Sequence, residues 1–331
     1  MIVARAPFRI SFFGGGTDFP PWYRKYGGSV LATTIDKYCY INIRRLPPFF
    51  DHKHRIVYSK IESVKSNSEI QHPSVRAVFD WAEVKEGLEL HHDGDLPARS
   101  GLGSSSAFTV ALVHALAALN GRMKTKEQLA KDAIHIEQDI IEEHVGSQDQ
   151  ISAAFGGFNR IDFNLDGSFS VDPVAVPLSR INELQSHLML FFTGLTRLAS
   201  DIEKTKIANL ENRMVELKEM HKMVGDAVDV LQDTSTSIEE FGRMLHQGWL
   251  YKKSLSDKVS NSEIDQIYDT ALKAGAVGGK ILGAGGGGFL LVLAKPEVHE
   301  RIRHKLDSLV HVPFNFESSG SRVILYQPEG M

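Results

Sequence analysis

The sequence has one cysteine, no long apolar run and no excess of positive charge. Cys39 alone cannot form an internal disulfide, so nothing points to an oxidising compartment. No apolar stretch approaches the ~18 residues of a membrane span. Arg5 and Arg9 interrupt the first apolar run, so we expect no signal peptide. With 37 Lys+Arg against 41 Asp+Glu, the overall basic charge of many nucleic-acid-binding proteins is missing. We therefore expect a cytoplasmic protein with no membrane or nucleic-acid partner.

The composition is that of a globular protein large enough for two domains. The chain has 331 residues, of which 42% are hydrophobic and 24% charged, and a domain averages roughly 150 residues. Glycine-rich loops separate strand and helix patterns up to about residue 178, and a strand–helices–strand–helix–strand order follows. We expect an α+β fold with domains at 1–178 and 179–331. Apolar spacing predicts one long helix over 201–232.

A loop in the middle of the first half has the composition of a phosphate-binding site. Residues 97–106 read PARSGLGSSS and open directly into an apolar helix. Glycines let the backbone approach a ligand closely, and N–H groups at a helix N-terminus bind anions. The candidates are Gly101, Leu102, Gly103, Ser104, Ser105 and Ser106. The lysine of a Walker P-loop is missing, and a loop that merely caps the helix is the alternative.

A second glycine-rich loop lies late in the chain, where residues 280–288 read KILGAGGGG. Its spacing formally matches the dinucleotide-binding fingerprint, but that motif must open a helix. Here a strand pattern follows at 289–293, so we reject a nicotinamide-dependent oxidoreductase. The glycines of this loop predict a close approach of the backbone to another group, with a conformational hinge as the alternative. The candidate residues are Gly283, Gly285, Gly286 and Gly287.

Two carboxylates between these loops are candidates for metal binding and base chemistry. Glu137 lies on a helix that Thr125 and Gln128 begin with a capping box and that we expect to reach about Glu143. Asp149 follows in the loop after this helix. One carboxylate as metal ligand and one as base would suit phosphoryl transfer. Acidic neighbours make a solvated helix face the alternative on spacing alone.

Taken together, the loops resemble the GHMP kinase superfamily. The resemblance rests on APFR (6–9) with GGGTD (14–18), on the Pro-x-x-x-Gly-Leu-Gly-Ser-Ser loop, and on the late glycine loop before a strand. RISFFGGGTD (9–18), ATTIDKY (32–38), SQDQ (147–150), FGGF (155–158) and FTGLTR (192–197) further resemble the family of D-glycero-D-manno-heptose 7-phosphate kinases. The kinase portion of fucokinases is also similar.

This resemblance implies a two-domain fold, ribosomal-S5-like then ferredoxin-like, with the site in the cleft between the domains. It implies ATP and Mg²⁺ as cofactors and transfer to the anomeric C1 hydroxyl of a sugar phosphate. The product would be heptose 1,7-bisphosphate, on the way to GDP-heptose for surface polysaccharides. A hexose 1-kinase of the fucokinase or galactokinase type and a non-enzymatic sugar sensor with the same fold are the alternatives. The oligomeric state stays open.

The resemblance also implies residue roles. Asp149 orients or deprotonates the anomeric hydroxyl, Arg9 stabilises the transferring phosphoryl group, and the 101–106 loop cradles the ATP phosphates. Glu137 holds Mg²⁺ together with one serine of 104–106, for which we name Ser105. The residues implied to bind substrate are Gly14, Gly15, Gly16, Thr17, Asp18, Lys37 and Arg197. Galactokinases place Glu and His where this chain has Gly15 and Gly16. A carboxylate there would repel a substrate phosphate, so the glycines favour an anionic substrate or a bulkier neutral sugar.

Overall fold

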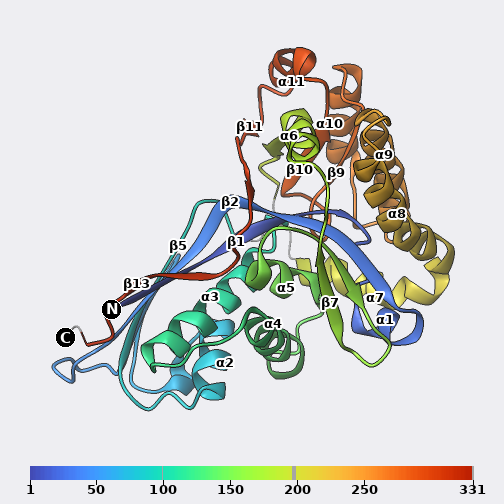
Figure 1. Cartoon of the computed structure of the whole chain (residues 1–331). Helices are drawn as coiled ribbons and strands as arrows, with labels where there is room; N and C mark the ends of the chain where they lie inside the picture. Colours follow the sequence, from blue (N-terminus) through green and yellow to red (C-terminus); the bar gives the residue numbers. More distant parts are fainter. Residues whose placement is uncertain (99, 196–198, 330–331) are drawn as a thin grey trace.

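The computed structural model describes residues 1–98, 100–195 and 199–329, and over these residues the strands form one sheet of nine strands and one of four. The larger sheet has the order β13-β1-β2-β5-β3-β4, while β6 and β12 pair with β2, and β7 pairs with β6 (Figure 1). Its strands are β1 (Ile2–Phe13), β2 (Gly28–Arg45), β3 (His54–Val57), β4 (Ile61–Val64), β5 (Leu88–Gly94), β6 (Phe158–Phe163), β7 (Phe169–Pro173), β12 (Phe316–Glu317) and β13 (Arg322–Tyr326).

Strand β2 organises this sheet because it is 18 residues long, against about 5–6 for an average strand. It pairs antiparallel with β1 over much of its length, with β6 at residues 28–33 and with β5 at residues 39–45. The segment GGGTD (14–18), called the first glycine loop below, therefore leaves the end of β1 and, after helix α1 (Pro20–Tyr26), returns to the start of β2. Both ends of the loop are fixed by the same sheet.

Helices α2 to α5 lie on one face of the large sheet (Figure 1). Helix α3 is buried on nearly all sides, as a helix that is apolar all round should be, since it packs on β1 and β2 and also contacts α2, α4 and α5. The remaining helices are α2 (Pro73–Trp81), α3 (Ser104–Leu119), α4 (Lys126–His135), α5 (Gln148–Phe155), α6 (Leu178–His187), α7 (Ala199–Asn209), α8 (Met214–Gln232), α9 (Glu239–Ser254), α10 (Ser262–Lys273) and α11 (His299–Lys305). In the described residues, no helix is both long and apolar enough to cross a membrane.

The smaller sheet has the order β11-β8-β10-β9, with all neighbours antiparallel. Its strands are β8 (Leu188–Phe192), β9 (Gly278–Ile281), β10 (Phe289–Leu293) and β11 (Val310–His311). Numbered along the chain, the order is 4-1-3-2, and helices connect β8 to β9 and β10 to β11. This is the βαββαβ arrangement of ferredoxin-like folds, so the expected α+β fold with a ferredoxin-like second part is confirmed.

The end of the chain returns to the first sheet. Strand β13 pairs with β1, and β12 pairs with β2 at Ile35 and Thr34. The sequence places the final strand in the second unit, and that expectation is wrong, because antiparallel pairing joins segments that are remote in the chain. A division into 1–178 and 179–331 stays a proposal, with these last strands contributed to the larger sheet.

The predicted long helix over 201–232 is interrupted. Helix α7 ends at Asn209, a 3₁₀ turn covers Leu210–Arg213, and α8 begins at Met214. Leu210 is buried with Phe19 and Trp22 of the first loop region. Apolar periodicity shows which side of a helix is buried but not whether the helix is continuous. Here the 3₁₀ turn lets the apolar sides of α7 and α8 both pack against the cluster that contains Phe19 and Trp22.

Candidate active site

The loop before α3 presents backbone groups to a ligand. Gly101 (φ 85°) and Gly103 (φ 74°) lie in the left-handed region that favours glycine, and Gly103 is the N-cap of α3. The first-turn N–H groups of a helix lack intrahelical acceptors, and the helix dipole makes this end positive. The first turn of α3, all of which the structure describes, contains no acidic residue. The loop therefore suits the phosphates of a nucleotide, as its sequence predicts.

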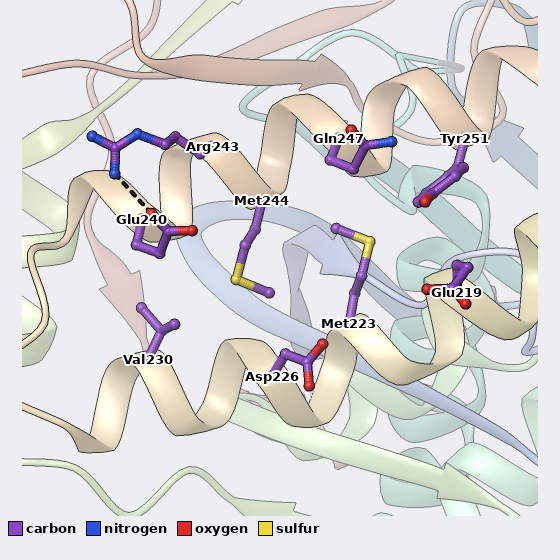
Figure 2. A pocket seen from close by; sticks show the side chains of 9 residues that line it. All are labelled: Glu219, Met223, Asp226, Val230, Glu240, Arg243, Met244, Gln247 and Tyr251. Carbon is purple, nitrogen blue, oxygen red and sulfur yellow. Dashed lines mark hydrogen bonds and ion pairs between the residues drawn. The ribbon is translucent and has the colours of Figure 1, made fainter.

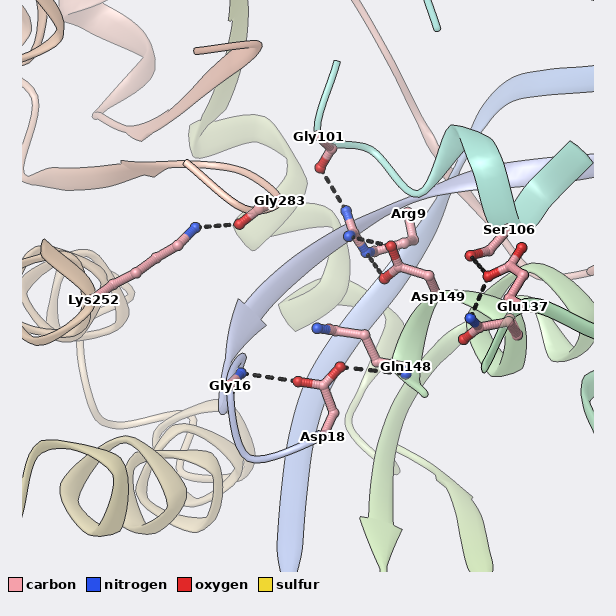
Figure 3. Close-up of polar contacts among 11 residues, drawn as sticks. Arg9, Gly16, Asp18, Gly101, Ser106, Glu137, Gln148, Asp149, Lys252 and Gly283 are labelled. Atoms are coloured by element: carbon pink, nitrogen blue, oxygen red, sulfur yellow. Dashed lines mark hydrogen bonds and ion pairs between the residues drawn. The ribbon is translucent and has the colours of Figure 1, made fainter. Parts of the chain in front are cut away.

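Arg9 and Asp149 form a bidentate ion pair beside this loop (Figure 3). Nε of Arg9 donates to Oδ1 of Asp149 and Nη2 donates to Oδ2, each at 2.7 Å, while Nη1 donates to the carbonyl oxygen of Gly101 at 2.7 Å. Arg9 comes from β1 and is 4% exposed, whereas the Asp149 side chain, in the first turn of α5, is 24% exposed. The pair joins β1, α5 and the phosphate loop and leaves part of the carboxylate accessible.

The late glycine loop connects β9 to β10 and lies against the phosphate loop. A Cβ at Gly283 would lie 2.4 Å from the Cα of Gly101, so only glycine fits. The other predicted glycines meet further backbone segments: Gly285 is crowded by Val259, Gly287 is crowded by Leu195, and the N–H of Gly286 donates to the Val259 carbonyl. The structure shows the predicted close backbone approach, and two antiparallel strands flank the loop, unlike a dinucleotide fingerprint. Contact of this loop with a ligand stays a prediction.

Glu137 is placed by a π-helical turn. The predicted helix to about Glu143 instead ends at His135, and a π turn covers Ile136–Ile140, closed by a hydrogen bond from the Ile141 N–H to the Ile136 carbonyl at 2.9 Å. Such turns are frequent at functional sites. The turn directs Glu137 inward, where it is 1% exposed and accepts hydrogen bonds from Ser106 Oγ at 2.8 Å and from Gln150 Nε2.

These residues fit a magnesium ion in part. Oε1 of Glu137 is buried without a hydrogen-bond partner, and burial raises the pKa of this carboxyl to about 7. A buried oxygen without a partner is costly unless a ligand meets it. The described residues contain no group of three or more His, Cys, Asp and Glu side chains that could hold a metal ion. Glu137, the Ser106 hydroxyl and nucleotide phosphate oxygens would together resemble a typical Mg²⁺ site.

The serine beside Glu137 is not the one the sequence favours. Ser105 is exposed, whereas Ser106 is 4% exposed and donates to the carboxylate. On a helix, adjacent residues point about 100° apart, so only one of two successive hydroxyls can face the same neighbour. Ser106 replaces Ser105 as the candidate metal ligand.

Thr17 in the first glycine loop has a structural role. Its hydroxyl is completely buried, lies 2.8 Å from the Gly14 carbonyl and 2.9 Å from the Ser29 carbonyl, and accepts from the Ser29 N–H at 3.1 Å. A Cβ at Gly14 would lie 1.9 Å from the same Ser29 carbonyl oxygen. Both residues therefore close the loop onto β2, and the Thr17 hydroxyl, which the sequence assigns to substrate, is already engaged.

Asp18 ties the first loop to α5. Its Oδ1 accepts from the Gly16 N–H at 2.9 Å, and its Oδ2 accepts from the Gln148 N–H at 3.4 Å. The residue is 2% exposed, and burial raises the pKa of its carboxyl, opposed by the Gly16 hydrogen bond. A Cβ at Gly146 would lie 1.9 Å from Oδ2. Asp18 thus fixes the loop beside Asp149, and its predicted contact with sugar hydroxyls stays a prediction.

The two basic residues that the resemblance implies bind substrate, Lys37 and Arg197, keep that role only as a prediction. Lys37 Nζ lies 3.1 Å from Oδ1 of its neighbour Asp36, whose other oxygen accepts from Asn315. This pairing is the ordinary alternative to a role in binding. Arg197 lies outside the residues that the structure describes.

Polar groups that sequence reasoning missed gather near Gly15. Ser11 Oγ and Gln148 Oε1 are buried without hydrogen-bond partners. A Cβ on Gly15 would lie 3.7 Å from Ser11 Oγ and 3.8 Å from Gln148 Nε2, so both side chains adjoin this glycine. Ser11 follows Arg9 by two residues and therefore shares its face of β1, a signal that the sequence did contain. These groups are suitable partners for ligand hydroxyls.

Two surface hollows lie away from these residues. One, of about 520 Å³, lies between α8 and α9 and is lined by Met223, Met244 and Tyr251 together with charged side chains (Figure 2). Another, of about 360 Å³, lies near residues 46–53. Neither is lined by a residue of the three glycine loops, by Arg9 or by Asp149, so we place the chemistry at the junction of the loops, where backbone donors and the ion pair converge.

Comparison with known proteins agrees with this arrangement. The family models for the GHMP kinases N terminal domain and for the GHMP kinases C terminal match residues 71–157 and 207–311. A D-glycero-alpha-D-manno-heptose 7-phosphate kinase from Campylobacter jejuni is 32% identical over 89% of this chain and 90% of its own length. A bifunctional fucokinase/GDP-fucose pyrophosphorylase from Arabidopsis thaliana is 26% identical over 93% of this chain but 31% of its own length.

A solved structure shares the fold over nearly the whole chain. It is a D-glycero-D-manno-heptose 1-phosphate kinase from Bacteroides thetaiotaomicron, is 25% identical, has a TM-score of 0.78 and covers 98% of both chains. Its name and that of the Campylobacter relative differ in the position of the substrate phosphate. With both family models matched in order and a relative 32% identical over 89% of the chain, the chain belongs to the GHMP kinase family, whose members use ATP as the phosphate donor.

Proposed function

We propose that this GHMP-family sugar kinase transfers the γ-phosphoryl group of ATP to the anomeric C1 hydroxyl of a sugar phosphate. D-glycero-D-manno-heptose 7-phosphate is the proposed substrate and heptose 1,7-bisphosphate the product, in the synthesis of GDP-heptose for surface polysaccharides. The Campylobacter heptose 7-phosphate kinase, 32% identical along 89% of the chain, supports the sugar. The placement of Asp149 and Arg9 at the phosphate loop supports the reaction.

The ion pair is the observation that carries the chemistry. Both oxygens of Asp149 are bonded to Arg9, whose third bond reaches Gly101. An acceptor hydroxyl that donates to the accessible side of Asp149 would therefore lie next to the phosphate loop. Phosphoryl transfer depends mostly on positioning and on charge stabilisation. Asp149 orients the hydroxyl and takes its proton, and Arg9 stabilises charge on the transferring group.

The remaining residues hold the nucleotide. Amides of the 101–106 loop and the N-terminus of α3 bind the phosphates, and Glu137 with Ser106 would hold Mg²⁺. A bound Mg²⁺ would neutralise charge on the phosphate oxygens. Ser11 and Gln148, whose buried polar atoms lack partners, would bind sugar hydroxyls near Gly15. We also propose that the protein acts in the cytoplasm on a small-molecule substrate.

A screen of acceptors tests this proposal. Consumption of ATP would be measured with heptose 7-phosphate, sedoheptulose 7-phosphate, fucose, galactose and mannose, and the phosphorylated position would be assigned by ³¹P NMR. Turnover of the heptose phosphate with a new phosphate at C1, absent from the Asp149→Asn variant, supports the proposal. A new phosphate at another position, or preference for an unphosphorylated sugar, contradicts it.

A hexose 1-kinase is the second candidate, because fucokinase portions match 92–93% of this chain. The same screen separates the two, since fucose or galactose would then be the preferred acceptor. A sugar sensor without activity would bind sugar and ATP but show no turnover with any acceptor.

A further inference from the structure

Three lysines from the second half of the chain are buried near the ends of the first glycine loop or at the late glycine loop. Lys206 of α7, Lys252 of α9 and Lys280 of β9 are each 5% exposed. Buried lysines are uncommon because their ammonium groups lose hydration. In the part of the chain that the structure describes, one of the three has a carboxylate within 4.0 Å: Lys206 lies 2.7 Å from Glu203.

Lys252 and Lys280 donate instead to backbone carbonyl groups beside the active site. Lys280 Nζ donates at 2.7 Å to the carbonyl of Phe12, just before the first glycine loop. Lys252 Nζ donates to the carbonyls of Ile281 and Gly283, at 2.8 Å and 2.5 Å. Figure 3 shows Lys252 projecting from α9 toward the side where Gly16, Gln148 and Asp149 lie. The two ammonium groups therefore border the loops that form the proposed site.

The charges of this region are unbalanced. Arg9 is paired with Asp149 and Lys206 with Glu203. Asp18 is a third buried carboxyl group near the loop, so these four basic side chains still outnumber the carboxyl groups around them. Burial, then Arg9 and Lys206, lower the pKa of Lys280 to about 7, and burial followed by Lys280 and Lys206 lowers that of Lys252 well below its usual value. Neutral hydrogen-bond donors could bind the same carbonyl groups without the free-energy cost of burying an ammonium group. An anionic ligand would offset it.

We propose that Lys252 and Lys280 form a binding site for the phosphate that the sugar substrate already carries. This inference rests on the proposed function for the identity of the sugar. A phosphate is recognised through charge-assisted hydrogen bonds, and an ammonium has three donors, of which the carbonyl bonds described above use two on Lys252 and one on Lys280.

The test measures binding to the full chain by calorimetry, without turnover. The probes are heptose 7-phosphate, the unphosphorylated heptose, inorganic phosphate and a non-hydrolysable ATP analogue. The variants are Lys252→Gln and Lys280→Gln, with Lys253→Gln as a matched control, since Lys253 pairs with Asp265 outside the site. For each site variant we expect a loss of at least tenfold in affinity for heptose 7-phosphate, and less than threefold for the unphosphorylated sugar and the ATP analogue. In the wild type, inorganic phosphate should compete with heptose 7-phosphate.

Three results would overturn the inference. Equal losses for both sugars would show that the lysines only hold the loops. A loss of affinity for the ATP analogue alone would show that the two lysines bind a phosphate of the nucleotide and not that of the sugar. Wild-type protein that binds the two sugars equally would have no site for the substrate phosphate. If heptose 7-phosphate is not turned over but another sugar phosphate is, the proposed function fails, and the lysine test is repeated with that sugar and its unphosphorylated form.

A measurement on wild-type protein covers the case in which the variants fail to fold. Reductive methylation, followed by mass spectrometry, reports the reactivity of each lysine. Heptose 7-phosphate should protect Lys252 and Lys280 at least fivefold more than the unphosphorylated heptose, while Lys253 should be unaffected. Equal protection by both sugars would contradict the assignment.

Discussion

Replacing Glu137 by glutamine tests both the buried carboxyl and its role at a metal. Burial raises the pKa of this carboxyl from 4.5 to about 7 in the folded chain. The folded state therefore binds the proton more tightly than the unfolded state between these values. Stability increases with pH only where the unfolded state binds more protons, so here it decreases as the pH rises from about 4.5 to 7, and the decrease stops above 7. Glu137→Gln removes this titration.

The size of the effect follows from the shift. Each pKa unit corresponds to about 1.4 kcal/mol, so a rise of about 2.5 units makes the unfolding free energy of wild type roughly 2–3 kcal/mol lower at pH 8 than at pH 5, relative to the variant. The amide of Glu137→Gln would place a donor where Oε1 has no partner. That cost is the same at both pH values and cancels in the comparison.

Urea unfolding of both proteins at pH 5, 6, 7 and 8 measures the difference directly. A second series at pH 8 adds Mg²⁺ with a non-hydrolysable ATP analogue, which should stabilise wild type more than the variant, because an anionic ligand becomes a neutral amide. Parallel pH curves would refute the burial argument. Equal stabilisation by Mg²⁺ and the analogue would show that Glu137 is not at the metal.

Asp149→Asn should reduce kcat by about 10²–10⁴-fold as the base is lost, and should also lower the melting temperature because buried Arg9 loses its charged partner; activity within fivefold of wild type would remove Asp149 from the mechanism. Gly283→Ala places a Cβ 2.4 Å from the backbone of the phosphate loop and should raise the KM for ATP at least tenfold, whereas Gly121→Ala, also at positive φ but with no atom within 4 Å, should leave that KM unchanged; similar KM values in steady-state assays would contradict this packing. Lys37→Ala should leave the KM for the sugar phosphate within twofold, because Lys37 pairs with Asp36; a tenfold rise would place it in the site.

Local chemistry explains which features could be predicted from the sequence. Glycine between a strand and an apolar helix predicts the phosphate loop, because positive φ and free N–H groups are properties of a few adjacent residues. The capping box at Thr125 formed as predicted, with reciprocal bonds to Gln128. Likewise, the strand pattern that follows the late glycine loop is enough to exclude a dinucleotide fingerprint, because that motif must open a helix.

The sequence did not predict where the helices end or which strands the last two strands pair with. A continuous periodic pattern hid the π turn at Glu137 and the break between α7 and α8, since an apolar stripe continues through both. The pairing of β13 with β1 joins the two ends of the chain, and no local pattern specifies such a partner. A late strand pairs with a sheet edge whose backbone N–H and C=O groups are still unpaired, and only the folded structure shows which edge that is.

Composition and spacing were therefore sufficient to locate the three glycine loops, while the resemblance to the GHMP kinases supplied the roles of Arg9, Glu137 and Asp149. Three-dimensional packing was required to bring Ser106 to Glu137, to pair Arg9 with Asp149 across 140 positions of sequence, and to set Lys252 and Lys280 beside the same loops. Burial and charge balance are properties of packed neighbours, and those neighbours come from strands and helices far apart in the chain. From the sequence alone a lysine is expected at the surface, and only the tertiary structure shows that Lys252 and Lys280 are buried.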